Sequence, residues 1–222
     1  MKVTLISHTP DPLKVLYLAA RTCYSPEPPS EMEIPSEEKI KKIIKNVYDR
    51  GHESVLEHVS FTFALEGVSR AMTHQLVRHR LASYSQQSQR YVRMKKEVVV
   101  PESIKKRGFF EEFSKEIERI FSLYERMIEN GIPEEDARYI LPNATTSNIV
   151  VTMNLRELIH VAGLRLCFRA QWEIRRAVAL MKWEVKKINP FLSSFLVPRC
   201  VRLGYCPEKE SCGLMPRRSL SP

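Results

Sequence analysis

Residues 78–91, RHRLASYSQQSQRY, form the densest polar cluster of the chain. This cluster contains three arginines, one histidine, three glutamines and three serines, and no acidic residue. Arginine forks match phosphate oxygens in a bidentate manner, and glutamine and serine side chains can bind a base edge or a ribose hydroxyl. A predicted helix that ends in Arg78-His79-Arg80 and enters this segment could hold a nucleotide. A solvated basic turn would have the same composition, and composition alone slightly favours that second reading.

Hydrophobic periodicity on both sides of the cluster indicates more helix than strand. We expect helices at 12–21, 37–50, 68–80, 110–130, 154–169 and 170–188, and strands at 3–6, 61–67, 91–100 and 148–153, with 81–90 irregular. Ser36 is the expected N-cap of the second helix, and Pro133 opens a further short helix that carries Arg138. The pattern predicts an α+β fold, a single mixed domain with a small, largely antiparallel sheet flanked by long helices. We expect this domain to span residues 1–190, followed by a cysteine-containing tail at 191–222.

The chain has 222 residues, of which 43% are hydrophobic, and a net charge of +9. This size suits one domain with a sizeable core. No apolar run is long enough for a membrane span, and the first residues lack the apolar core of a signal peptide, so we expect a cytoplasmic protein with no membrane partner. The positive charge suggests an anionic partner: nucleic acid, a phosphorylated small molecule or an acidic membrane.

The order of residues in the cluster is more specific than its composition. Arg78-His79-Arg80, followed after seven residues by Ser88, resembles the signature of flavin-dependent thymidylate synthases. Ser85 and Gln86 stand where this family often has Asn and Glu, and both substitutions keep a polar group. Further segments resemble the family in the same order, namely 51–54 (GHES), 57–63, 137–142 (ARYILP), 154–156 (NLR), 164–165 (LR) and 170–174 (AQWEI). The resemblance runs from about residue 15 to residue 190.

The resemblance implies a set of flavin contacts and an assembly. The implied FAD-binding residues are Ser54, Arg78, His79, Arg80, Gln86, Asn154, Arg156 and His160. Arg156 and His160 are four positions apart on a predicted helix, so they share one of its faces. The family binds FAD between the subunits of a homotetramer, and we expect the same assembly for this chain.

The resemblance also implies a dUMP site. Its implied residues are Gln75, Arg78, Gln86, Gln87, Ser88, Gln89, Arg90, Arg138 and Arg165. Arg90 and Arg138 would hold the phosphate, and Arg165 corresponds to the catalytic arginine of the family. Attack from C5 of uracil requires electron density pushed from the ring, and a guanidinium near N3 and O2 favours the ionised ring. Ser88 lacks a neighbouring base other than His79, so we expect it to donate a hydrogen bond to dUMP instead of acting as a nucleophile.

The implied reaction methylates dUMP to dTMP, with methylenetetrahydrofolate as carbon donor, FAD as hydride carrier and NADPH as reductant. The chain contains no GxGxxG fingerprint after a strand, so it shows no Rossmann site. The main alternative is a basic nucleic-acid-binding module, which the charge and the arginine cluster would also fit. The chain shows no nucleic-acid-binding motif and few aromatic residues beside the arginines, so we expect no nucleic-acid partner.

Three cysteines crowd the C-terminal tail at even spacing: Cys200, Cys206 and Cys212. With Cys167 as a fourth ligand, these thiols could bind a structural zinc ion, although the spacing is looser than the CxxC pairs of zinc ribbons. A disulfide with free thiols and five reduced cysteines are the two alternatives. In each linked case the tail would be a structural clasp and not part of the chemistry.

Overall fold

A computed structural model describes residues 1–217 of the chain. Its contacts divide the chain into two compact units. The first unit comprises Met1–Lys2, Leu65–Arg78 and Tyr84–Val150, and the second comprises Val3–Ala64, His79–Ser83 and the chain from Val151 onward. The expected boundary at residue 190 between a catalytic domain and a tail stays a prediction.

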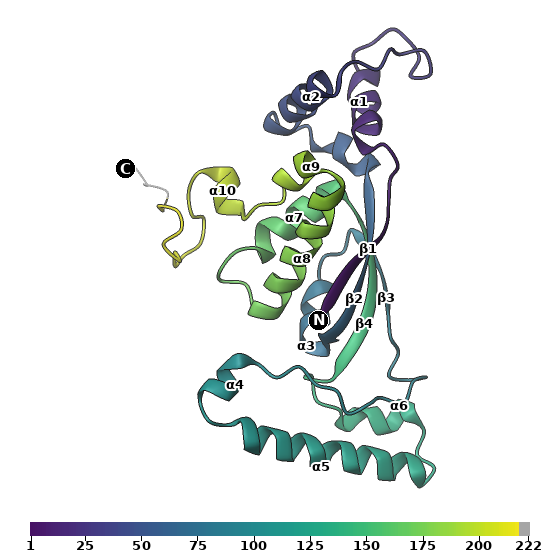
Figure 1. Cartoon of the computed structure of the whole chain (residues 1–222), viewed down its shortest axis with the longest axis vertical. Helices are drawn as coiled ribbons and strands as arrows, with labels where there is room; N and C mark the ends of the chain where they lie inside the picture. The colour runs from purple at the N-terminus through teal and green to yellow at the C-terminus, as the bar shows by residue number, and fades with distance from the viewer. Residues whose placement is uncertain (218–222) are drawn as a thin grey trace. The chain divides into compact units, whose positions relative to one another are not determined.

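Four strands form one antiparallel sheet (Figure 1): β1 (Lys2–His8), β2 (Ser60–Ser69), β3 (Ala82–Gln86) and β4 (Thr146–Asn154). Their order is β1-β2-β4-β3, which leaves β1 and β3 at the edges. Buried residues alternate along β2 and β4, as expected for strands with one buried face. The small antiparallel sheet among many helices confirms the predicted α+β class.

The helices described in the second unit are α1 (Pro12–Thr22), α2 (Glu37–Asp49), η1 (Glu53–His58), α7 (Leu155–Arg165), α8 (Trp172–Ile188), α9 (Pro190–Ser194) and α10 (Arg199–Leu203). The Ser36 hydroxyl accepts a hydrogen bond from the amide of Lys39 at 3.4 Å, which confirms the predicted N-cap of α2. The buried side of α7 includes Leu158, and that of α8 includes Ile174 and Val178.

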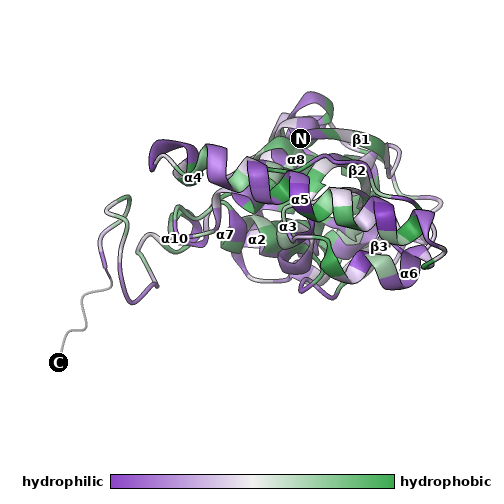
Figure 2. Cartoon of the chain, turned by 90° about the horizontal axis from the view of Figure 1, so that it is seen from below, coloured by the Kyte–Doolittle hydropathy of each residue, from purple (hydrophilic) through white to green (hydrophobic). Residues whose placement is uncertain are grey.

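The helices described in the first unit are α3 (Arg70–Leu76), α4 (Glu102–Lys106), α5 (Phe110–Glu129), α6 (Glu134–Ala137) and η2 (Arg138–Ile140). Residues of α5, α6 and η2 contribute to a small hydrophobic core. Hydrophobic and hydrophilic residues alternate along α5 in Figure 2, and its buried stripe joins Met94 and Ala137 in this core. The Tyr124 hydroxyl accepts a hydrogen bond from the amide of Met94 at 3.1 Å, so the buried hydroxyl has a hydrogen-bond partner within the protein.

Four sequence-based assignments were wrong. Residues 91–100 form no strand apart from an isolated bridge of Val98 to Thr145, and residues 82–86 form β3 instead of an irregular loop. The helix expected at 68–80 is shortened to Arg70–Leu76 because Ser69 caps its start. Strand β2 continues through Gly67 to Ser69 instead of ending there, and the φ of 63° at Gly67 is accessible to glycine without strain.

None of the helices within residues 1–217 has the length and apolar character that crossing a membrane requires.

Candidate active site

A cavity of about 650 Å³ in the second unit holds three of the predicted flavin contacts. It is lined by Glu53, Glu57, Leu81, Asn154, Arg156, Glu157, His160 and Arg202. Its volume lies in the range typical of small-molecule and cofactor sites. Asn154, Arg156 and His160 meet here because the first precedes α7 and the other two occupy its first turns.

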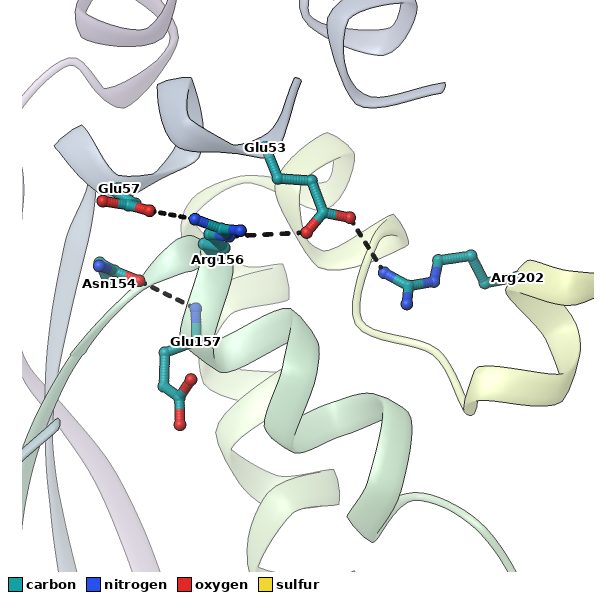
Figure 3. Close-up of polar contacts among 6 residues, drawn as sticks. All are labelled: Glu53, Glu57, Asn154, Arg156, Glu157 and Arg202. Carbon is teal, nitrogen blue, oxygen red and sulfur yellow. Dashed lines mark hydrogen bonds and ion pairs between the residues drawn. The ribbon is translucent and has the colours of Figure 1, made fainter. Parts of the chain in front are cut away.

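Arg156 lies between two carboxylates of η1 (Figure 3). Its guanidinium donates a hydrogen bond to Glu57, and its Nε lies 3.7 Å from Oε2 of Glu53. The hydrogen bond to Glu57, followed by the negative charges of Glu57 and Glu53, raises the pKa of Arg156, although partial desolvation opposes the shift. Arg156 therefore stays cationic and could exchange these carboxylates for an anionic ligand.

Asn154 has a structural task in the protein chain alone. Its side-chain oxygen accepts a hydrogen bond from the amide of Glu157 at 2.9 Å, which caps the N-terminus of α7 (Figure 3). The amide nitrogen of the same side chain can still serve a ligand, because this cap uses only the oxygen. The predicted cofactor role of Asn154 and its role as a cap are therefore compatible.

The predicted catalytic Arg165 is held by a predicted flavin contact, His79. Nε of Arg165 donates a hydrogen bond to Nε2 of His79 at 3.0 Å, and the ring of His160 lies edge-on to that of His79 with centroids 6.0 Å apart. Burial, then the charge of Arg165, then His160 lower the pKa of His79 from 6.5 to about 4. Desolvation also lowers the pKa of Arg165 from its usual value.

Ser54 and the other arginines of the Arg-His-Arg triplet lie elsewhere. Ser54 lines a second cavity, of about 190 Å³, with Cys23, Arg50 and His52 among its neighbours. Arg80, in the second unit, has an exposed side chain. Arg78, in the first unit, is exposed as well. Exposed cationic side chains can contact an incoming ligand or another subunit, so their predicted roles stay predictions.

The two predicted phosphate-binding arginines of the first unit share one partner. Arg90 forms an ion pair with the carboxylate of Glu135, and Nε of Arg138 donates to the backbone carbonyl of Glu135 at 3.0 Å. Arg70, which sequence analysis missed, belongs to the same group. Burial, then the nearby Arg138 charge, lower the pKa of Arg70. Crowded cationic side chains of this kind gain stability when an anion enters between them.

The glutamines of the polar segment are held by strand β4 and helix α3. Gln86 donates to the hydroxyls of Thr73 and Ser147 at 2.9 and 3.2 Å, so its amide points into the protein. Gln87 accepts hydrogen bonds from both the backbone and the side-chain amide of Asn148 at 3.3 Å. These contacts fix the segment, which leaves Ser88 to accept a hydrogen bond from the Arg90 amide at 3.1 Å.

Two more predicted substrate residues of the first unit contrast in burial. Gln89 is buried, with 8% of its surface exposed, whereas Gln75 on α3 is half-buried and donates to the Ala71 carbonyl at 3.5 Å. Their predicted contacts with dUMP stay predictions.

All four cysteines of the predicted zinc site line one small cavity of about 20 Å³: Cys167, Cys200, Cys206 and Cys212. Each is a free thiol, and burial, then the neighbouring thiols Cys167 and Cys206, raise the pKa of Cys200. Within residues 1–217, however, no three His, Cys, Asp or Glu side chains gather as metal ligands do. The four predicted ligands therefore lie around one cavity, and the zinc site stays a prediction.

Sequence analysis missed several residues of the main cavity. Glu53 and Glu57 could have been found, because both lie in the part of the chain that resembles the family and both belong to η1. Arg202 carried no signal, because it lies beyond residue 190 in a tail that was expected to be a clasp. Glu157 was missed because it looks like a first-turn acidic residue of α7.

Comparisons with known proteins agree with this arrangement of motifs. A family model described as thymidylate synthase complementing protein matches residues 4–191. The chain is 48% identical to the flavin-dependent thymidylate synthase of Pyrococcus abyssi, over 97% of this chain and 92% of that protein. It is 47% identical to the enzyme of the same name from Geobacter sulfurreducens, over 96% of this chain and 94% of that protein.

A solved structure supports the fold. The crystal structure of the UMP/dUMP methylase PolB from Streptomyces cacaoi, with bound 5-Br dUMP, matches with a TM-score of 0.80 and 24% identity. The match covers 87% of this chain and 93% of that one. Together with the family match over residues 4–191 and the two relatives that align over nearly the whole chain, these findings establish that the protein belongs to the flavin-dependent thymidylate synthase family.

Proposed function

We propose that this flavin-dependent thymidylate synthase converts dUMP to dTMP with methylenetetrahydrofolate as carbon donor and NADPH as reductant. The observation that carries the proposal is the arrangement of the second unit. There, Arg156 and His160 line a cavity, and Arg165 is held in place by His79. Bound FAD would supply the hydride chemistry, for which the side chains of this cavity offer no substitute.

The donor set of the cavity fits an anionic, hydrogen-bonding cofactor. Arg156 can bind a phosphate oxygen, His160 can donate to a ring or ribose oxygen, and the free amide nitrogen of Asn154 adds a third donor. We propose that these three side chains, with His79, hold the flavin, and that Ser54, Arg78, Arg80 and Gln86 contribute as the family resemblance implies. The flavin sites would lie between subunits of a homotetramer.

For dUMP we propose that Arg90 and Arg138 bind the phosphate. Their shared partner Glu135 supports this role, because a phosphate dianion can displace a carboxylate from an exposed arginine. Arg70 adds a third positive charge to the group. The segment from Gln86 to Gln89, together with Gln75, would then hold the nucleoside part.

Arg165 would act on the uracil ring. A guanidinium that donates to the ring oxygens and nitrogen stabilises the negative charge that develops when C5 attacks the one-carbon unit. His79 acts as a positioning residue, because its unprotonated Nε2 accepts the hydrogen bond that fixes the Arg165 guanidinium. The cysteines of the tail would have no part in this chemistry, and any zinc or disulfide there would be structural.

The test uses the purified full-length protein. We expect a yellow protein with flavin absorption in the near-ultraviolet and blue, and dTMP formation that stops when dUMP, methylenetetrahydrofolate or NADPH is left out. A second experiment adds NADPH without the folate and monitors the absorbance of bound FAD. Loss of the flavin absorbance then tests NADPH as the reductant independently of the carbon donor. Protein that stays colourless after incubation with FAD, and that forms no dTMP, would contradict the proposal.

A further inference from the structure

The main cavity contains a side chain from an unexpected part of the chain, Arg202. This residue lies on α10, beyond the family match at residues 4–191 and beyond the predicted catalytic segment at 1–190. Nevertheless, it lines the cavity together with the predicted flavin contacts Arg156 and His160. The tail therefore contributes a positive charge to a site that the earlier part of the chain builds.

Charges of opposite sign alternate along one edge of this cavity (Figure 3). Nη1 of Arg202 donates to Oε1 of Glu53 at 3.2 Å, and the other oxygen of Glu53 faces Nε of Arg156 at 3.7 Å. Arg156 in turn pairs with Glu57. Each carboxylate of Glu53 and Glu57 thus has a guanidinium beside it, and only Glu53 has two.

A short helix anchors Arg202 at this place. On α10, Cys200 is buried in the thiol-lined cavity, whereas Arg202 reaches in another direction to Glu53. Gly204 ends the helix in the left-handed region, with φ of 76°, where a glycine is unstrained. The anchored backbone gives the guanidinium a defined position, so the contact costs less conformational entropy than one from a free tail would.

Within residues 1–217, Glu53 pairs with Arg156 and Arg202, so removal of the Arg202 charge would leave Arg156 as its cationic neighbour. Three acidic side chains, Glu53, Glu57 and Glu157, line the cavity beside the two arginines, and without Arg202 they would face Arg156 alone among the lining arginines. The diphosphate of FAD is an anion, and an excess of carboxylates repels it.

We propose that Arg202 is a positioning residue of the flavin site that neutralises Glu53 and so keeps Arg156 available to the diphosphate of the cofactor. This inference rests on the proposed flavin function. It assigns the tail a role in cofactor affinity.

The test measures the dissociation constant of FAD by fluorescence titration of the full-length protein after removal of bound flavin. We expect Arg202→Gln to weaken FAD binding about tenfold, the range of one charge-assisted contact. Arg202→Lys, which keeps the charge, should stay within about threefold of the wild type. Arg199→Ala removes an arginine from the same helix that does not line the main cavity, and it should bind FAD normally.

The double variant Glu53→Gln/Arg202→Gln tests how Arg202 acts. It distinguishes neutralisation of Glu53 from a direct contact of Arg202 with FAD and from a general contribution of Arg202 to the stability of the fold. If Arg202 acts through Glu53, this variant binds FAD as well as Glu53→Gln alone, because no carboxylate remains to be neutralised. A double variant as weak as Arg202→Gln alone, or wild-type affinity in Arg202→Gln, would overturn the inference. A wild-type protein that binds no FAD would instead refute the proposed function.

Discussion

His79 has the most unusual electrostatics of any single residue in the candidate site. Its Nε2 accepts a hydrogen bond from Arg165, which requires that nitrogen to be unprotonated. The carboxylate of Glu157 lies 3.9 Å from Nδ1 and would favour a charged imidazole. That separation is too long for a hydrogen bond, and burial raises the pKa of Glu157 itself, so the Arg165 contact and burial prevail. His79 is therefore neutral at pH 7, with its pKa lowered to about 4.

The lowered pKa of His79 predicts a loss of stability in mild acid. Unfolded chains take up this proton near pH 6.5, whereas the folded protein resists it until about pH 4. The unfolded state thus binds more protons in this window, and the free energy of unfolding falls as the pH falls. Between about pH 7.5 and pH 5 the wild type should lose about 2 kcal/mol more than His79→Gln. Urea unfolding at both pH values measures this, and equal losses in the two proteins would contradict a neutral, buried His79.

The arginines should differ in the kinetic constant that they control. Arg90→Ala and Arg138→Ala each remove a phosphate contact, so the KM for dUMP should rise roughly ten- to a hundredfold. Arg165→Ala should lower kcat even at saturating dUMP, because its contact matters most in the transition state. Arg119→Ala is a matched control, since Arg119 is an exposed residue of α5 that pairs only loosely with Glu116. Normal kcat in Arg165→Ala would show that its assigned role is wrong.

At the scale of secondary structure, hydrophobic periodicity predicted the long amphipathic helices but missed the short polar strand β3. Helices α5, α7 and α8 were predicted because their apolar stripes are long and regular. Strand β3 was missed because its serines and glutamine give no apolar alternation; it forms an edge of the sheet, where pairing to β4 stabilises it. The expected strand at 91–100 failed because valine-rich sequence favours a strand only where a partner strand is present.

Site residues that belong to the family motifs were predicted from the sequence. Site residues that join the site only through tertiary contacts were missed. The segment around Asn154 and Arg156 matched the family pattern, so these cavity residues could be named from sequence. Glu135 and Arg70 could not, because they join the arginine group only after α3 and α6 are in place. The same applies to Arg202, which reaches Glu53 across 149 residues of sequence.

The cysteines on α10 and in the segment that follows it differ in burial, so their reactivity can be predicted. Because all five cysteines are free thiols in the structure, we expect all five to titrate under denaturing conditions. In the native protein, exposed Cys23 and Cys212 should alkylate before buried Cys200 and Cys206. The raised pKa of Cys200 delays its reaction further, since less thiolate is present at a given pH. Timed alkylation with mass spectrometry and elemental analysis check this, and zinc near one per chain would support the metal site.

On the scale of the whole molecule, the net charge of +9 is compatible with several anionic partners. The arginines nevertheless occupy different settings. Arg90 and Arg138 lie around Glu135, Arg156 and Arg202 around Glu53, and Arg165 against His79. A surface for a nucleic-acid backbone would present its cationic side chains to the solvent without carboxylate partners. Pairing with acidic side chains instead suits small anions, which can replace a carboxylate at one defined place.

Thermal unfolding distinguishes the two kinds of partner in the intact protein. A ligand that binds only the folded state stabilises it by about 2.7 kcal/mol at a hundredfold its dissociation constant. For a chain of this length, such a gain corresponds to a rise in Tm of roughly 5–10 °C. We expect FAD to give this rise and a short oligonucleotide of the same total charge to give none. Light scattering of the FAD-bound protein should give a mass near four times 25.8 kDa, since we expect the flavin to lie between subunits. If the oligonucleotide raises Tm while FAD does not, the arginines serve a nucleic acid, and the flavin assignment fails.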